Sequence, residues 1–285
     1  MNKLLTLLCI TSLSIAVSAE DRFSGVEIKT IPVSDNIYML MGSGGNIGVS
    51  VGDDGLLIID DQYAPLSEKI KVALSQLGDS SPTFLINTHY HGDHTGGNKN
   101  FAAHSLIMAH DNVYKRLSLE KDSEASALPV ITFKQSLSIH FNGEEIKLVH
   151  MPSGHTDGDS IVFFSQSNVV HMGDHFFKDR FPYVDLGAGG TVDGLIFNIS
   201  KTLGEIDVDT RVIPGHGELA SKADLENYYK MLVETSSVVK SRIDAGKSID
   251  EILEAGLDVK WKDWAAGFIT EERWIQTLYK NFSGG

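Results

Sequence analysis

The feature that most constrains this chain is the segment INTHYHGDHTGGN at residues 86–98, which places His89, His91, Asp93 and His94 within six positions. Burying so many imidazole and carboxyl groups is costly unless something binds them. The run TFLINT at residues 83–88 predicts a buried strand that ends where the cluster begins. The segment therefore predicts a loop at a strand end that holds metal.

The spacing inside the cluster indicates two metal ions. His89 and His91 are two residues apart and face the same way in an extended loop. Imidazole nitrogen is a preferred zinc ligand, and carboxylate oxygen is acceptable beside it. The adjacent Asp93 and His94 do not easily reach the same ion as both earlier histidines, but they reach a second ion a few ångströms away.

Three further residues are candidate ligands because each follows a predicted strand and lies beside glycine. They are His155 in MPSGHTDGD, Asp174 in HMGDHFF and His216 in VIPGHGE. The carboxyl ends of strands are where α/β proteins place their sites, and small neighbours let the backbone approach a ligand. Ordinary hydrogen-bonding or core roles are expected for the other histidines considered, namely His104, His110, His140, His150, His171 and His175.

The pattern of elements predicts an α/β fold with two sheets and helices outside them. Strands are expected at 26–33, 37–42, 46–52, 55–60, 83–88, 105–110, 145–150, 160–165, 168–173 and 211–215. Helices are expected at 64–77, 111–118 and 192–204, and residues 221–283 read as mostly helical. The glycine-rich segment 42–46 is predicted to be a mobile hairpin tip.

The first nineteen residues are typical of a secretory signal peptide. A lysine precedes an apolar run from Leu4 to Val17, and small residues end the segment at Ala19. We expect cleavage after Ala19, a soluble periplasmic protein, and one domain over residues 20–285 whose C-terminal part, about 221–285, is helical. The single cysteine, Cys9, lies in the removed segment, so no disulfide is expected.

The net charge of −14 argues against two classes of partner. A strongly acidic surface repels phosphate backbones and anionic lipid, so neither nucleic acid nor membrane is expected. A small-molecule substrate is expected instead, because a local cationic site can overcome the net field. The oligomeric state is not predicted by these features.

The motif HYHGDH is similar to the HxHxDH signature of the metallo-β-lactamase superfamily, and His155, Asp174 and His216 occur in the expected order. The resemblance covers about residues 30–220 and implies a four-layer αββα sandwich with the site on one edge. Carried over, His89, His91 and His155 would hold one metal. Asp93, His94 and His216 would hold the other, and Asp174 would bridge the two.

The resemblance implies an exported hydrolase with two Zn²⁺ that cleaves a cyclic amide or ester such as a β-lactam or lactone. Two cations lower the pKa of a bridging water to about 7, and the resulting hydroxide attacks the substrate. Asp93 would orient that hydroxide and take its proton. An aspartate at the bridging position resembles glyoxalase II enzymes and lactonases, whereas dizinc β-lactamases often carry cysteine there.

Four alternatives to this reading remain. They are a thioesterase of the glyoxalase II type, a mononuclear iron persulfide dioxygenase, an RNA-processing nuclease and a non-catalytic metal- or partner-binding protein. The dioxygenase would not need His94 and His216, and the nuclease conflicts with the acidic charge. After Asp174, Lys178 is predicted to meet a substrate carboxylate and Phe177 to wall the pocket.

Overall fold

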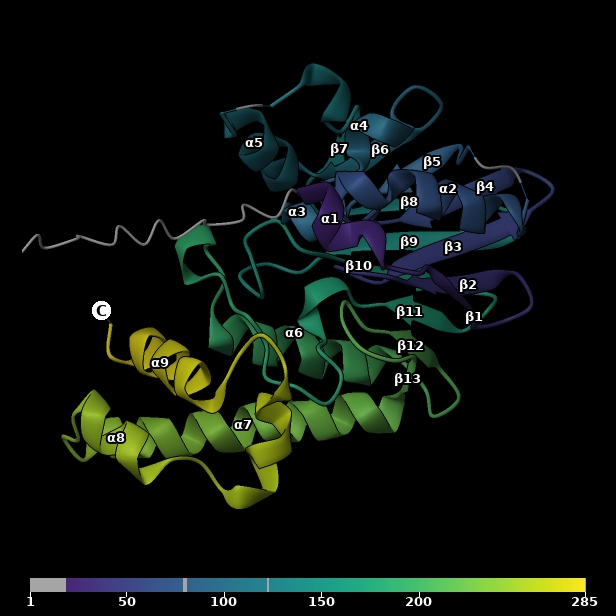
Figure 1. The fold of residues 1–285 in the computed structure, drawn as a ribbon. Coiled ribbons are helices and arrows are strands. Elements are labelled where there is room, and N and C mark those ends of the chain that lie inside the picture. The colour runs from purple at the N-terminus through teal and green to yellow at the C-terminus, as the bar shows by residue number, and fades with distance from the viewer. Residues whose placement is uncertain (1–18, 79–80, 122, 285) are drawn as a thin grey trace, which may run out of the picture.

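Two β-sheets stacked face to face form the centre of the molecule (Figure 1). The computed structural model describes residues 19–78, 81–121 and 123–284. The predicted signal peptide lies outside this part of the chain, apart from Ala19, which begins helix α1. The architecture is therefore described for the domain that follows it.

The first sheet has the order β1-β2-β3-β4-β5-β6-β7. Neighbouring strands are antiparallel from β1 to β4 and parallel from β4 to β7. The parallel half directs the ends of β4, β5 and β6 to one edge of the sheet. The strands are β1 Lys29–Pro32, β2 Ile37–Met41, β3 Ile47–Gly52, β4 Gly55–Ile59, β5 Phe84–Ile86, β6 Leu106–His110 and β7 Ile131–Phe133.

The second sheet has the order β13-β12-β11-β10-β9-β8. It is antiparallel except for the pair β11 and β12, whose ends therefore lie side by side. The strands are β8 Ser136–Phe141, β9 Glu144–His150, β10 Ser160–Phe164, β11 Val169–His171, β12 Arg211–Ile213 and β13 Ala220–Ser221.

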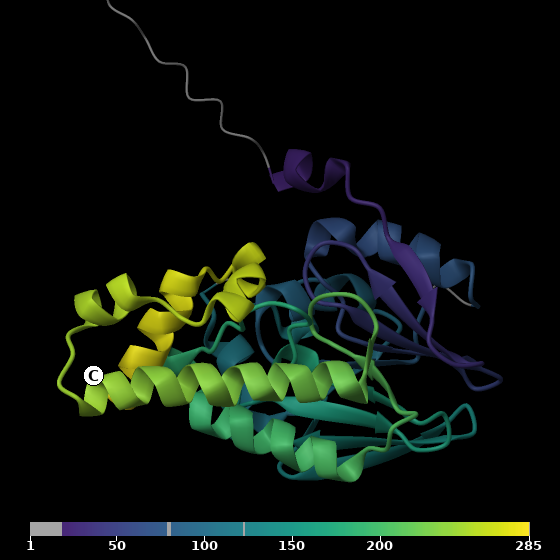
Figure 2. The same cartoon turned by 90° about the horizontal axis from the view of Figure 1, so that it is seen from below.

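Helices cover the outer faces of both sheets. Figure 1 shows α2 over the first sheet, with α6 and α7 against the second, and Figure 2 shows α7 lying along α6. The α-helices are α1 Ala19–Ser24, α2 Ser67–Ser75, α3 Gly92–Thr95, α4 Asn98–Phe101, α5 Asp111–Leu119, α6 Val192–Glu205, α7 Lys222–Asp244, α8 Ile249–Ala255 and α9 Glu271–Phe282. The 3-10 turns are η1 Ala64–Leu66, η2 Ala125–Ala127, η3 Gly173–His175, η4 Leu186–Ala188 and η5 Val259–Ala266. None of the helices within the described ranges is long and apolar enough to cross a bilayer.

Strand β4 shows why this sequence forms four layers. Its side chains alternate between the two faces of the sheet, as in any strand. Leu57 and Ile59 belong to the core between the sheets, together with residues such as Leu148 of β9. Leu56 and Ile58 belong to the separate core under α2. Both sets are buried, so the first sheet must be covered on both sides.

The prediction of a layered α/β sandwich is confirmed. The C-terminal segment is helical, as predicted, and Trp274 of α9 is fully buried with Trp261 and Trp264 in the core beside α7. Strands β7, β8 and β13 were not predicted, because they are short or alternate with many exposed polar residues. The predicted strand at 83–88 ends early at Ile86, since Asn87 and Thr88 already turn toward the site.

The glycine-rich segment 42–46 joins β2 and β3 as a hairpin tip, and its predicted mobility stays a prediction. The backbone nitrogen of Gly45 donates to the Asp93 carbonyl at 3.0 Å, and that of Asn46 donates to the Gly215 carbonyl at 2.7 Å. The Gln62 amide also donates to the Gly45 carbonyl at 2.7 Å. These bonds hold the loop against the histidine cluster.

Candidate metal centre

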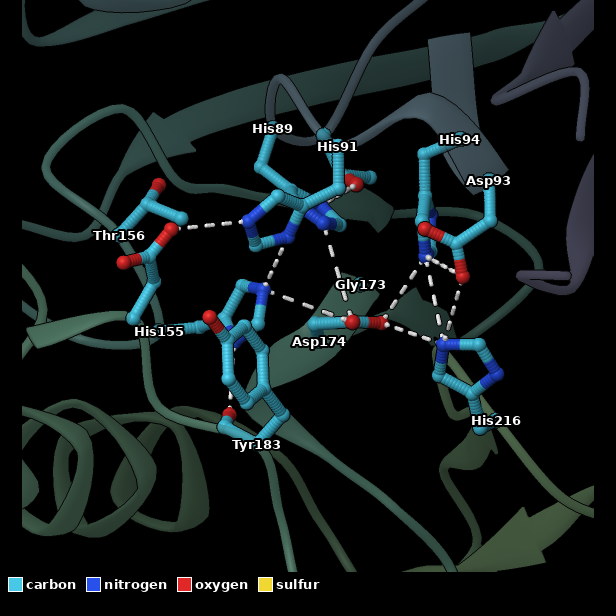
Figure 3. Close-up of polar contacts among 12 residues, drawn as sticks. His89, His91, Asp93, His94, His155, Thr156, Gly173, Asp174, Tyr183 and His216 are labelled. Carbon is cyan, nitrogen blue, oxygen red and sulfur yellow. Dashed lines mark hydrogen bonds and ion pairs between the residues drawn. The ribbon is translucent and has the colours of Figure 1, made fainter. Parts of the chain in front are cut away.

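Loops at four strand ends bring the candidate ligands to one edge of the sandwich (Figure 3). His89 and His91 follow β5, and the short helix α3 carries Asp93 and His94. The remaining three come from the second sheet: His155 lies between β9 and β10, Asp174 lies in η3 after β11, and His216 follows β12. Segments far apart in the sequence thus point their side chains at a common centre.

One group consists of His89, His91, His155 and Asp174, with one ligand atom from each within 4.8 Å of the others. Nε2 of His155 lies 2.8 Å from Nδ1 of His91. The Asp174 oxygen Oδ2 is 3.5 Å from His155 Nε2 and 3.7 Å from His89 Nε2. Three ring nitrogens and a carboxylate oxygen therefore surround one point.

The second group consists of Asp93, His94 and His216. Nε2 of His216 lies 3.5 Å from that of His94 and 3.4 Å from Oδ2 of Asp93. The other Asp174 oxygen, Oδ1, is 3.1 Å from His94 Nε2 and 3.3 Å from His216 Nε2. Asp174 thus presents one oxygen to each group, the arrangement that a carboxylate needs to bridge two cations.

The outward-facing nitrogens of four rings have acceptors that determine where each proton sits. Nδ1 of His155 donates to the Tyr183 carbonyl at 2.8 Å. The carboxylate of Asp185 accepts from His91 Nε2 at 3.1 Å, and that of Asp60 accepts from His94 Nδ1 at 2.7 Å. Each ring so oriented turns its other nitrogen toward the centre.

The outer nitrogen of His89 also has a hydrogen-bond acceptor, which is a hydroxyl group. The Thr88 hydroxyl donates to Asp60 at 2.8 Å, so it must accept from Nδ1 of His89, which lies 3.0 Å away. The inner nitrogen of His89 is buried without a hydrogen-bond partner, and the same is true of Oδ1 of Asp174. Outer bonds of this kind orient metal-binding histidines in general.

These contacts make the centre fit for divalent cations. Because the outer nitrogens of His91 and His155 donate outward, their inner nitrogens, 2.8 Å apart, need a shared proton or a metal cation between them. Buried polar atoms without partners are rare, and two of them occur here. The nitrogen and oxygen ligands are those that zinc and other divalent transition metals prefer.

The electrostatics agree with a site for positive charge. Burial lowers the pKa of His89 and lowers that of His155 to about 4, so both rings are neutral at pH 7. Burial also opposes charge on His94, but the carboxylates of Asp174, Asp93 and Asp60 raise its pKa well above the usual value. Burial would raise the pKa of Asp174, yet the imidazoles of His216, His94 and His89 hold it well below the usual value.

Comparison with known families gives the decisive match. The family described as the metallo-beta-lactamase superfamily matches residues 42–216, more than half of the chain, and this range contains all seven candidate ligands. The chain belongs to the metallo-beta-lactamase superfamily. It is accordingly an enzyme of the metal-dependent hydrolase type, with a histidine and aspartate cluster suited to a divalent metal.

Relatives within the superfamily are distant. A "Beta-lactamase-like protein 2 homolog" of Caenorhabditis elegans is 25% identical over 226 residues, covering 78% of this chain and 70% of that protein. A "Hydroxyacylglutathione hydrolase" of Crocosphaera subtropica is 26% identical over 192 residues, covering 67% of this chain and 65% of that protein. A solved metallo-beta-lactamase from Pontibacter korlensis shares the fold at 15% identity, with a TM-score of 0.62, covering 72% of this chain and 99% of that one.

Within this metallo-β-lactamase fold, all seven residues predicted as ligands lie together, as Figure 3 shows. Of the two predicted substrate contacts, Phe177 lines the cavity beside the centre and stacks on the His216 ring with centroids 5.0 Å apart. The prediction that Lys178 meets the substrate is wrong, because Lys178 does not line that cavity. Its ammonium donates to the Leu219 carbonyl at 3.2 Å and pairs with Asp224 at 3.6 Å.

Two aspartates that orient ligands were not predicted. Asp60 follows β4 and accepts from Thr88 and His94, and a residue at the end of an apolar strand is a signal that would have identified it. Asp185 accepts from Tyr90 at 2.6 Å and from His91 at 3.1 Å. It lies in a long irregular segment where local sequence gives no comparable signal.

Proposed function

We propose that this enzyme is an exported dinuclear zinc hydrolase that cleaves a cyclic amide or ester. The observation that carries the proposal is the sharing of Asp174 between two ligand groups, one oxygen toward each. A mononuclear centre has no use for the second group of Asp93, His94 and His216. This argues against the iron dioxygenase alternative.

The seven ligand residues would form two metal sites that share Asp174. His89, His91 and His155 with Asp174 would hold one zinc ion, and Asp93, His94 and His216 with Asp174 would hold the other. When bound, the two ions would acidify a water molecule and polarise the substrate carbonyl. Each oriented ring would offer its inner nitrogen to a metal, because its other nitrogen donates outward.

Asp93 is the residue to which we assign the transfer of the proton. Its side chain is 22% exposed and lines the cavity, whereas Asp174 is almost fully buried. Its Oδ2 lies 3.4 Å from His216 Nε2 and so reaches the second ligand group. A carboxylate in contact with both the centre and the substrate space can orient a nucleophile and accept its proton.

The volume of the cavity beside the centre supports a small substrate. It has a volume of about 730 Å³ and contains Asp93, Asp174 and His216 in its lining. Cavities of this size bind drug-sized molecules. A small acyl compound therefore suits this cavity.

Thioester hydrolysis is a second candidate, because one of the relatives is named a hydroxyacylglutathione hydrolase. The oxygen-only bridge of Asp174 suits either reaction. The two candidates differ in the leaving atom, which is sulfur in a thioester and nitrogen or oxygen in a lactam or lactone.

Metal analysis of the purified protein coupled to a hydrolysis panel tests the proposal. We expect about two equivalents of zinc, turnover of a β-lactam or lactone, and loss of turnover by about 100-fold or more in Asp93→Asn. Preferential turnover of a thioester would replace the first candidate with the second. One equivalent of iron with oxygen consumption would overturn both.

Export to the periplasm is the remaining part of the proposal. Its support is the signal-like sequence of residues 1–19, and cleavage is expected after Ala19. Mass spectrometry of the protein recovered from cell fractions tests it, with a chain beginning at Glu20 in the periplasmic fraction as the expected result. A full-length chain confined to the cytoplasm would contradict it.

A further inference from the structure

The guanidinium group of Arg116 in helix α5 contacts two of the loops that carry metal ligands, although it does not line the cavity beside the centre. We propose that Arg116 is a positioning residue for the three-histidine group, His89, His91 and His155, and that it raises the affinity of this group for its metal ion. This inference rests on the proposed dinuclear function, because it assigns Arg116 to one of two metal sites.

Arg116 forms a bidentate ion pair with Asp157. Its Nε lies 2.7 Å from Oδ1, and its Nη2 lies 2.8 Å from Oδ2. Asp157 is two residues after the ligand His155, in the loop between β9 and β10. The Asn112 amide, also on α5, donates to the Asp157 carbonyl at 2.8 Å. Because two parallel bonds fix geometry as well as charge, the pair fastens the His155 loop to α5.

The same guanidinium group lies over the ring of Tyr90, with Cζ 5.2 Å from the ring centroid. Tyr90 immediately precedes the ligand His91, and its ring packs against a cluster that includes Val113 of α5. The Tyr90 hydroxyl donates to Asp185 at 2.6 Å, and Asp185 accepts from His91. The attraction between a cation and an aromatic face thus stabilises the ring whose hydroxyl orients Asp185.

The two contacts of the guanidinium group are connected through segment 185–189. The backbone nitrogen of Asp157 donates to the Ala188 carbonyl at 2.9 Å. The backbone nitrogen of Asp185 donates to the His155 carbonyl, also at 2.9 Å. Gly189 has φ of +77° and lies so close that a Cβ there would be 3.1 Å from that of Asp157. These contacts form a closed set around two ligands of the three-histidine group, and the guanidinium group completes it from the side of α5.

The second ligand group, Asp93, His94 and His216, is held by other contacts. Nδ1 of His94 donates to Asp60 at 2.7 Å. In the part of the chain that the structure describes, the hydrogen bonds, the ion pair and the ring contact of Arg116 all go elsewhere. A general loss of stability would weaken both groups, whereas a positioning role predicts that only the three-histidine group is weakened.

Metal titrations in two ligand-deleted backgrounds test the proposal. His216→Ala keeps the three-histidine group complete, and His91→Ala keeps the second group complete. We expect Arg116→Met to lower the zinc affinity about 10-fold in the His216→Ala background, as loss of an outer partner does, and to leave it unchanged in the His91→Ala background. Competition with a chromophoric chelator gives both Kd values. Equal falls in the two backgrounds, or no fall in the first, would overturn the proposal.

Lys115→Met is the matched control, because Lys115 is an exposed cation at the preceding position of α5. It should leave the zinc affinity unchanged in both backgrounds. Arg116→Lys should recover part of the affinity that Arg116→Met loses, since lysine keeps the charge but lacks the planar fork. A fall in Lys115→Met as large as that in Arg116→Met would show a general effect of charge and would refute the role of Arg116.

Cadmium NMR of the protein with all seven ligands separates this proposal from the proposed function, and it needs neither deleted background. Each bound cadmium ion gives its own resonance, so a dinuclear centre predicts two resonances in the wild type. Arg116→Met should shift or broaden one of them and leave the other in place. A single resonance in the wild type would refute the dinuclear function, while its response to Arg116→Met would still decide the role of Arg116. An unchanged spectrum in Arg116→Met would overturn that role in either case.

Discussion

Asp185 and His91 are joined by a hydrogen bond of 3.1 Å from Nε2 of the ring to Oδ2 of the carboxylate. The same oxygen accepts from the Tyr90 hydroxyl at 2.6 Å, and the backbone nitrogen of Asp185 donates to the His155 carbonyl at 2.9 Å. One residue thus contacts two members of the same ligand group. It positions the His91 ring so that Nδ1 faces the centre.

Asp185→Asn should therefore weaken metal binding. The amide is a poorer acceptor for the His91 N–H, and loss of such an outer partner typically lowers metal affinity by about 10- to 100-fold. Competition with a chromophoric chelator measures this. Tyr90→Phe is the comparison, because it removes only the hydroxyl bond and should have a smaller effect. Equal affinities for Asp185→Asn and wild type would contradict the positioning role.

Gly45→Ala should damage the centre although Gly45 is no ligand. A Cβ at this position would lie 2.1 Å from Cε1 of His94, whose ring is fully buried and bonded to Asp60. We expect loss of at least one metal equivalent and about 1–3 kcal/mol of stability.

Gly92→Ala is the matched control for that substitution. It lies inside the HYHGDH motif, yet a Cβ there would meet no atom within 4 Å. Metal content by elemental analysis and the free energy of unfolding should both stay near wild type. Comparable damage in the two variants would show that proximity to the motif matters more than the clash with His94.

Metal removal should lower thermal stability. Without a metal cation, the inner nitrogens of His91 and His155, 2.8 Å apart, have only a shared proton to hold them together. A ligand that binds only the folded state stabilises it by about 4 kcal/mol at a free concentration 1,000 times its Kd. Calorimetry before and after chelation, and after zinc is restored, measures the effect. A Tm that does not respond to zinc would contradict the assignment of a metal centre.

A second histidine pair predicts how stability depends on pH. His110 and His150 stack with ring centroids 3.6 Å apart, away from the metal ligands. Burial lowers the pKa of both, and the His150 charge lowers that of His110 further, although Asp157 acts on both rings and Asp111 acts on His110 in the opposite direction. Nδ1 of His110 also accepts the backbone N–H of Asn112 at the start of α5, a bond that protonation would break.

The lowered pKa values determine the direction in which stability changes with pH. As pH falls below about 6.5, the unfolded chain takes up protons that the folded chain resists, so stability declines until the folded-state pKa is reached. His110→Asn should reduce the loss between pH 7.5 and 5.5, since asparagine caps a helix without titrating. Urea unfolding at both pH values measures it, with the exposed His140 changed to asparagine as control. An equal acid loss in His110→Asn and wild type would refute the prediction.

The local sequence was sufficient to predict which residues form the candidate centre. His89, His91, Asp93 and His94 come from one loop, and His155, Asp174 and His216 each follow an apolar strand, so strand ends alone suggested where they would meet. The order of the expected strands and the amphipathic helices likewise indicated layers of sheets and helices. Burial periodicity is a local property of a chain, which is why a sequence reveals it.

The tertiary structure decided which groups surround those ligands and which cation lines the cavity beside them. The pairing of Asp185 with His91 joins positions 94 residues apart, and the packing of segment 42–46 on Asp93 depends on the order of the strands in the first sheet. Lys178 was predicted to reach the substrate, yet it turns to Asp224, whereas Arg180 lines the cavity. The direction of a side chain in an irregular segment depends on contacts with distant residues, and local sequence does not encode them.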